Sequence, residues 1–128
     1  MKNVDVVKEL YRCVREQDDA GFRRVVTDDL EWVQCAGFPG GAVRHGADEV
    51  LSGVLRANRE RWNGFAYEVE RMLDAGDSVV VLGRYSGRAG TTGKPMSVVA
   101  AHVYELVGGK VRRFLMYADT APMHDALR

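Results

Sequence analysis

The feature that most constrains this chain is the series of strand-like segments in its second half. Four stretches have the apolar, β-branched and aromatic character of strands, namely residues 65–73, 79–85, 97–107 and 111–118. Short glycine-containing turns separate them, namely residues 74–77, 87–93 and 108–109. Strands that are joined by short turns pair as antiparallel neighbours. The second half is therefore predicted to form four antiparallel strands.

The first half is predicted to supply helices and two short strands. The expected elements are, in order, a helix at 3–16, a short helix at 22–26, a strand at 30–34, a glycine- and proline-rich loop at 37–41, a strand at 43–45 and a helix at 48–62. The first helix has its apolar residues at a spacing of three to four, as an amphipathic helix requires. Helix, helix, strand, strand, helix and then four strands is the order of an α+β domain.

Length and composition are those of one globular domain, residues 1–128, with 46% hydrophobic and 28% charged residues. The 18 basic and 18 acidic residues cancel. A domain that binds nucleic acid usually carries a basic excess, so nucleic acid is not an expected partner. No stretch approaches the roughly 18 apolar residues that cross a membrane, and the first residues lack the apolar core of a signal peptide. We therefore expect a cytoplasmic protein without membrane contacts.

The sequence contains none of the common motifs for metals or cofactors. Cys13 and Cys35 lack metal-ligand spacing, and His45, His102 and His124 are dispersed. There is no glycine-rich loop for a dinucleotide or a phosphate, and no nucleophile elbow. We expect no cofactor and no metal, and we expect both cysteines to be reduced, small apolar side chains.

The strand at 98–107 predicts that both faces of the sheet are covered. Alternate residues put Val98, Ala100, His102, Tyr104 and Leu106 on one face and Val99, Ala101, Val103, Glu105 and Val107 on the other. Neither set is clearly polar, whereas a sheet with one wet face alternates apolar and polar residues. Because the helices cover one face only, we expect a second copy on the other face, in a two-fold homodimer.

Three segments resemble one known superfamily. Residues 102–120 look like the closing hairpin of the nuclear-transport-factor-2-like superfamily, and of its SnoaL-like branch of polyketide cyclase and ketosteroid isomerase-like proteins in particular. Asp28–Trp32 and Gly46–Val50 are similar to the same branch. With the order of elements, the resemblance spans nearly the whole chain. It implies an α+β cone, in which a strongly bent antiparallel or mixed sheet wraps a long helix and leaves a pocket at the open end.

The superfamily includes ketosteroid isomerases, polyketide cyclases, limonene epoxide hydrolases, scytalone dehydratases and binding proteins, so the fold does not choose the chemistry. The resemblance places the isomerases' base at Gln34, their tyrosine near Leu10 and their acid at His102. Gln34 cannot accept a proton from carbon, and Tyr11 lies about 100° around the helix from Leu10. The isomerase site is therefore expected to be lost.

The hydrolase and cyclase sites are also incomplete by the same resemblance. Arg84 stands at the arginine of the hydrolases' Asp–Arg–Asp set, but Ser86 and Met116 stand at its aspartates. The acid/base aspartate of the SnoaL-like cyclases also falls on Met116. His102 remains the candidate catalytic residue, because histidine titrates near neutral pH.

The direction of the His102 side chain depends on the turn between the last two strands. We predict a three-residue turn with a glycine bulge, which pairs Leu106 with Lys110, puts His102 opposite Phe114 and turns it into the pocket. The alternative is a two-residue turn that pairs Val107 with Lys110. A regular strand after that turn would point His102 at the partner subunit.

Two functions remain open. The first is the binding of a small apolar or polycyclic molecule in an aromatic-lined pocket that lacks the family's catalytic carboxylates. The expected wall of this pocket is Trp32, Gln34, Phe38, Trp62, Arg84, Phe114 and Met116. The second is a cofactor-free isomerase, cyclase or dehydratase that uses His102 as acid/base. A buried His102 with a shifted pKa and a polar partner would favour the enzyme.

Overall fold

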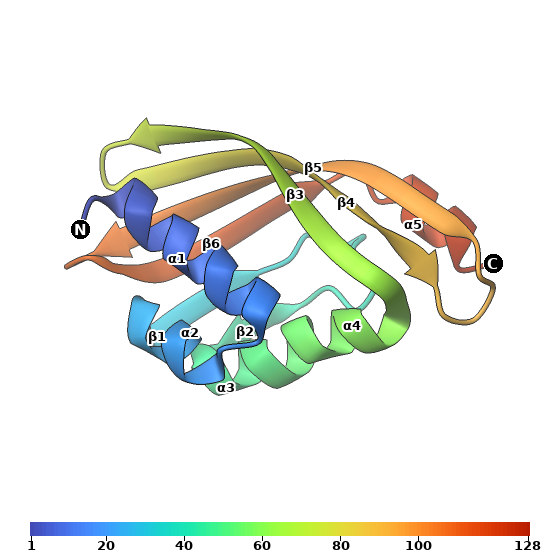
Figure 1. Cartoon of the computed structure of the whole chain (residues 1–128), viewed down its shortest axis with the longest axis horizontal. Coiled ribbons are helices and arrows are strands. Elements are labelled where there is room, and N and C mark those ends of the chain that lie inside the picture. Colours follow the sequence, from blue (N-terminus) through green and yellow to red (C-terminus); the bar gives the residue numbers. More distant parts are fainter.

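Six strands form one mixed sheet in the computed structural model, which describes all 128 residues (Figure 1). The strands are β1 (Val26–Val33), β2 (Val43–His45), β3 (Trp62–Ala75), β4 (Ser78–Ala89), β5 (Pro95–Val107) and β6 (Lys110–Ala118). Their order across the sheet is β2-β1-β6-β5-β4-β3. β1 runs parallel to β6, and every other neighbouring pair is antiparallel. The predicted antiparallel strands of the second half are confirmed, and β1 and β2 extend their sheet.

α1, α2 and the long helix lie on one side of this sheet, beneath its curved strands, whereas α5 lies at the far end of the sheet beside β4 and β5 (Figure 1). The helices are α1 (Asn3–Glu16), α2 (Asp19–Val25), α3 (Gly46–Val50), the π-helical η1 (Leu51–Arg56), α4 (Ala57–Arg61) and α5 (Ala121–Ala126). α3, η1 and α4 follow one another without a break and form one helix of 16 residues. The α+β cone is confirmed. None of the helices is long and apolar enough to cross a membrane.

The core lies between the helices and the inner face of the sheet. β4 and β5 alternate buried and more exposed residues along most of their length, so the pleat sends every second side chain inward. The outer face carries large apolar side chains in solvent, among them Leu82, Val99 and Tyr117, which are 38%, 51% and 57% exposed. No helix covers these residues.

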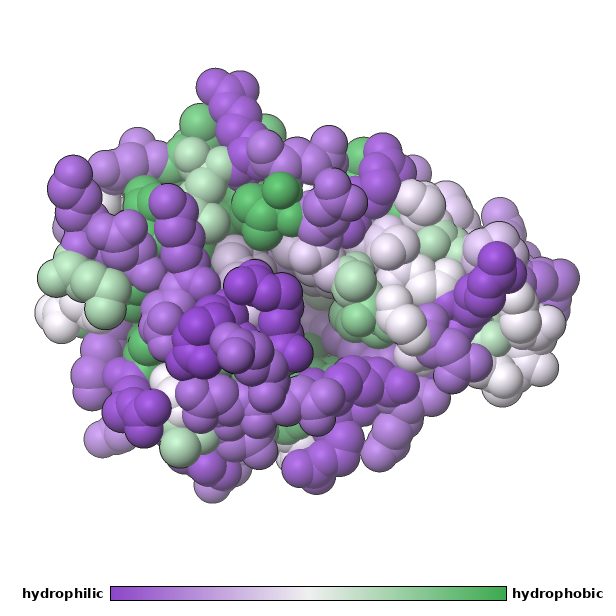
Figure 2. All heavy atoms as spheres, in the orientation of Figure 1, coloured by the Kyte–Doolittle hydropathy of each residue, from purple (hydrophilic) through white to green (hydrophobic).

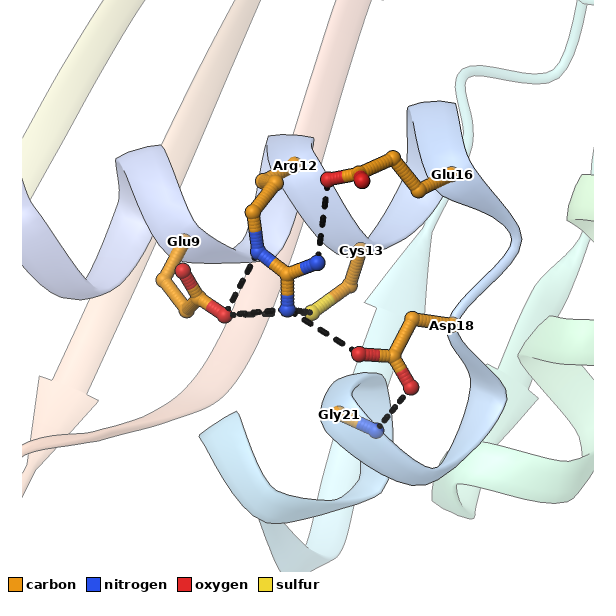
Figure 3. Close-up of polar contacts among 6 residues, drawn as sticks. All are labelled: Glu9, Arg12, Cys13, Glu16, Asp18 and Gly21. Carbon is orange, nitrogen blue, oxygen red and sulfur yellow. Dashed lines mark hydrogen bonds and ion pairs between the residues drawn. The ribbon is translucent and has the colours of Figure 1, made fainter.

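An ionic cluster fixes the corner between α1 and α2 (Figure 3). The Arg12 guanidinium lies between the carboxylates of Glu9, Glu16 and Asp18. The second oxygen of Asp18 accepts the backbone N–H of Gly21 at 2.9 Å and so caps α2. A Cβ atom at Gly21 would lie 2.4 Å from the Asp18 carboxylate, so this close approach requires glycine. The cluster sets the direction in which the chain leaves α1.

The hairpin between β5 and β6 differs from the prediction. Val107 pairs with Lys110 around a two-residue turn, and both turn residues, Gly108 and Gly109, have positive φ angles of 58° and 78°. Two central residues with positive φ form the tight turn whose twist suits a hairpin. The predicted pairing of Leu106 with Lys110 is therefore wrong.

A β-bulge just beyond the turn restores the inward direction of His102. The register shifts between Leu106, which faces Val111, and Glu105, which faces Arg113, so β6 contains one extra residue. His102 consequently lies opposite Met116, and the predicted partner Phe114 is wrong. The one-residue shift at the turn and the one-residue shift at the bulge add up to two residues, which returns His102 to the inner face. His102 is therefore on the inner face, where it is 3% exposed. The strand register that puts it there is neither of the two that were predicted from the sequence.

Candidate functional site

A cavity of about 320 Å³ opens between the C-terminal half of α1, the long helix and β3. Figure 2 shows a hollow in this face of the molecule, with hydrophilic residues around it. Thirteen of its 19 lining residues are hydrophobic. The aromatic part of the wall consists of Tyr11, Trp32, Phe65, Tyr67, Tyr85, Tyr104 and Phe114. The cavity is therefore suited to a small molecule with an apolar, planar body.

His102 is held in this wall by two tyrosines. Its Nδ1 atom is 2.7 Å from the Tyr11 hydroxyl, and its Nε2 atom is 2.6 Å from the Tyr85 hydroxyl. The three residues come from α1, β4 and β5, and all three are buried. Both ring nitrogens thus have a hydrogen-bond partner.

Aromatic rings enclose the imidazole on its other sides. Tyr67 stacks on it with ring centroids 4.1 Å apart, and Phe114 meets it edge-on at 4.8 Å. The Tyr67 hydroxyl donates to the backbone oxygen of Ala100 at 2.8 Å, which fixes the stacked ring. Trp32 lies flat against Phe114 with centroids 3.8 Å apart. His102 therefore stands in an apolar setting, away from any charged group.

This setting determines the protonation of the cluster. Burial lowers the pKa of His102 to about 3, because a charged imidazolium would lose its hydration without gaining a counter-charge. Burial also raises the pKa values of Tyr11, Tyr85 and Tyr104 well above the usual value for tyrosine. At neutral pH the cluster thus consists of a neutral imidazole and intact phenols.

The cluster contains one more proton donor than its internal bonds use. A neutral imidazole has one N–H and one acceptor nitrogen, so one of Tyr11 and Tyr85 donates to the ring and the other accepts from it. The accepting tyrosine keeps its own O–H. One hydroxyl of the cluster can therefore donate to an acceptor in the cavity.

Two further polar atoms in the wall lack a partner. Gln34 and Trp32 are 5% and 4% exposed, and neither the Gln34 Oε1 atom nor the Trp32 Nε1 atom makes a hydrogen bond within the protein. A buried polar atom without a partner costs about 1–3 kcal/mol. Both residues belong to the cavity wall, although these two atoms themselves are shielded from water.

The structure brings together five of the eight residues that the sequence analysis selected. The cavity wall includes Trp32, Gln34, His102, Phe114 and Met116. The side chains of Phe38, Trp62 and Arg84 are not part of it.

The three residues that do not line the cavity lie elsewhere for different reasons. Phe38 is buried behind the wall, where its ring packs on Tyr85 at a centroid distance of 5.5 Å. Trp62 is fully buried at the start of β3, where it pairs with Ala89. Arg84 lies on the outer face of β4 and donates to Ser97 at 3.2 Å, because neighbours in a strand point to opposite faces and Tyr85 points inward.

Sequence reasoning excluded Tyr11 only from the position of the isomerases' tyrosine, and the structure places Tyr11 in the cavity wall. The wide arc of α1 that faces the cavity includes both Leu10 and Tyr11, although they differ by about 100° around the helix. Tyr67 and Tyr104 also belong to the wall. The sequence contained a signal for both. Tyr67 is two residues from Phe65, and Tyr104 is two residues from His102, a spacing that puts the two side chains of each pair on the same face of a strand.

No group of three or more histidine, cysteine, aspartate or glutamate side chains that could hold a metal ion is present. The residues of the cavity wall carry hydroxyl, amide and indole groups instead.

Comparison with known proteins agrees with this architecture. The family model of the SnoaL-like domain matches residues 7–114. The chain belongs to the SnoaL-like domain family. Among solved structures, this SnoaL-like chain is similar to an NTF2-like protein from Burkholderia thailandensis, with 31% identity, a TM-score of 0.95 and coverage of 100% of this chain and 98% of the other.

More distant structures share the fold of this SnoaL-like protein. TerC co-crystallised with polyporic acid is 21% identical, with a TM-score of 0.85 and coverage of 98% and 97% of the two chains. A protein of ketosteroid isomerase-like fold from Catenulispora acidiphila, in complex with trimethylamine, is 16% identical, with a TM-score of 0.80 and coverage of 94% and 90%. The search of curated proteins found no match.

Proposed function

We propose that this SnoaL-like protein binds a small planar molecule, apolar or polycyclic, in its aromatic cavity. One observation carries the proposal, namely a cavity of about 320 Å³ whose wall is mostly hydrophobic and contains the hydrogen-bonded chain Tyr11–His102–Tyr85. An apolar wall with a few convergent polar groups is typical of a small-molecule site. Two proteins of the same fold have been crystallised with small molecules, polyporic acid and trimethylamine.

The test is the binding of N-phenyl-1-naphthylamine, an uncharged aromatic dye that fluoresces in apolar surroundings. We expect saturable binding to the wild-type protein and its loss in Leu55→Trp, because Leu55 lines the cavity and is half-buried. Val43→Trp is the matched control, since Val43 is 50% exposed on the edge strand β2. Equal binding to both variants would contradict the proposal.

A second candidate is a cofactor-free isomerase, cyclase or dehydratase, and the Tyr11–His102–Tyr85 chain favours it. His102 meets the expected signs of burial, a shifted pKa and polar partners. With a pKa of about 3, however, it cannot be the charged acid at neutral pH. It would act as a relay. One tyrosine gives its proton to the first ring nitrogen and takes a proton from the reacting molecule, while the second ring nitrogen gives its proton to the other tyrosine, which passes its own hydroxyl proton to the reacting molecule.

Deuterium exchange of 2-tetralone separates the two candidates. An enzyme of this kind would accelerate exchange beside the carbonyl in D₂O, as measured by NMR, and His102→Gln would remove the acceleration. A binding protein would bind the ketone without accelerating exchange.

We also propose that the protein is a homodimer that associates through the outer face of its sheet. Leu82, Ala101 and Tyr117 stand in one row across β4, β5 and β6, and Val103 and Leu115 belong to the next row. Such a continuous apolar surface is stabilised when a second copy covers it.

The proposed location is the cytoplasm. Cys13 and Cys35 are free thiols, a state that the reducing cytoplasm maintains. Fractionation of the producing cells tests this location.

A further inference from the structure

The charged side chains of the cavity all have one sign. Its 19 lining residues include Arg15 and Arg59 and no aspartate or glutamate. The whole chain balances 18 basic against 18 acidic residues, so this excess of positive charge is local. A cleft lined by one sign of charge concentrates ions of the opposite sign.

Both arginines stand one helical turn from groups of the cavity wall. Arg15 follows Tyr11 by four residues on α1, and Arg59 follows Leu55 by four residues on the long helix. Residues at this spacing share one face of a helix and lie about 5–6 Å apart. Arg15 is exposed and Arg59 is half-buried, whereas Tyr11 is buried. The two guanidinium groups therefore belong to the open end of the cavity.

Neither guanidinium has a partner in the protein. The eight ion pairs of the structure include neither Arg15 nor Arg59. Arg12, three residues before Arg15, shows the opposite arrangement, because three carboxylates surround it (Figure 3). Arg15 and Arg59 are thus free to bind an anion from solution.

We propose that the ligand is an aromatic acid. Its ring system would lie in the cavity against Tyr67 and Trp32, and its anionic group would bind Arg15 and Arg59 at the mouth. This inference rests on the proposed binding function and adds the charge and the orientation of the ligand. Guanidinium is suited to this task because it is always charged and presents a planar set of donors to carboxylate or sulfonate oxygens.

The experiment compares two dyes with the same anilinonaphthalene body. One is 8-anilinonaphthalene-1-sulfonate, which is an anion, and the other is the uncharged N-phenyl-1-naphthylamine. We expect the wild-type protein to bind the sulfonate more tightly. The double variant Arg15→Gln, Arg59→Gln should weaken sulfonate binding about tenfold and change the binding of the neutral dye much less. The affinity of the wild type for the sulfonate should also fall with added salt.

The matched control is the double variant Lys8→Gln, Arg56→Gln. It removes two exposed cations from the same two helices, and neither residue lines the cavity. It should bind both dyes as the wild type does. Leu55→Trp should abolish the binding of both dyes, which shows that the fluorescence reports the cavity and no apolar surface elsewhere.

The outcomes separate this inference from the function on which it rests. If both dyes bind the cavity equally and the arginine variant changes neither affinity, the aromatic acid is excluded while the binding function stands. An equal loss in the control variant would mean a general attraction by surface charge and would also overturn the inference. If neither dye binds, the proposed function itself fails.

Discussion

His102 is a histidine that resists protonation, and this property follows from its immediate contacts. Each ring nitrogen of His102 is hydrogen-bonded to a tyrosine hydroxyl, and a stacked aromatic ring takes the place of water beside the imidazole. Arg84, which was expected in the cavity wall, points to the outer face of the sheet. At the scale of single residues, the site therefore combines neutral hydrogen-bonding groups, and charge is confined to the mouth of the cavity.

The lowered pKa of His102 predicts how stability depends on pH. In the unfolded chain the imidazole takes up a proton below about pH 6.5, whereas in the folded protein it does so only near pH 3. The free energy of unfolding should therefore be highest above pH 6.5 and fall by about 1.4 kcal/mol per pH unit between pH 6.5 and 3. Urea unfolding at pH 6.5 and pH 5 should differ by about 2 kcal/mol from this residue alone.

The variant His102→Gln is the control for this dependence, because glutamine does not titrate. Its stability should change less between pH 6.5 and pH 5 than that of the wild type. If that variant does not fold, NMR titration of the His102 ring in the wild type provides the second measurement. A protonated ring at pH 5 would contradict the prediction.

Among the elements, the paired strands β3 and β4 come close together at a glycine that makes room for the stacked tyrosine. A Cβ atom at Gly83 would lie 2.4 Å from the Glu68 backbone oxygen and 2.6 Å from the Tyr67 ring. The close approach coincides with an irregular register between Val69 and Arg71. The strand pairing therefore depends on glycine here in order to hold Tyr67 over His102.

Gly83→Ala should displace Tyr67. We expect a loss of about 1–3 kcal/mol in the free energy of unfolding, as for overpacking of a core, and weaker binding of N-phenyl-1-naphthylamine. Gly87→Ala in the same strand is the control, because the nearest atom to its new Cβ would be 3.3 Å away. Denaturant unfolding and dye titration measure both effects. Equal stability and equal binding of the two variants would show that the Tyr67 ring has room to move.

At the scale of the whole molecule, the sheet has two apolar faces and one set of helices. The helices and the inner face enclose the cavity, whereas Leu82, Val99 and Tyr117 remain exposed outside. This asymmetry is the physical basis for the proposed dimer.

Ala101→Glu should convert the proposed dimer into a monomer. Ala101 stands between Leu82 and Tyr117 in the outer row, so a glutamate there would bring an unpaired charge into the interface. Sedimentation at micromolar concentration should show a dimer for the wild type and for Val43→Glu, and a monomer for Ala101→Glu. A monomeric wild type would refute the prediction.

Much of the fold could be read from the sequence because its signals are local. The spacing of Val7, Leu10 and Tyr11 predicted α1, and the glycine pair at 108–109 marked the last hairpin. Part of the cavity wall could be predicted as well. Trp32, Phe114 and Met116 lie on strands whose inner face follows from the alternation of side chains, and Gln34 directly follows β1.

The tertiary structure determined the side-chain directions that depend on how two strands are paired. The extra residue in β6 turns His102 inward, and no local pattern announces it, because a bulge is stabilised by the pairing of two whole strands. The place of Tyr11 depends on how α1 lies across the sheet, and Arg84 faces outward because Tyr85 faces in. The sequence determined which elements form. Packing between elements far apart in the chain determined which side chains meet, since each contact in the Tyr11–His102–Tyr85 chain joins two different elements.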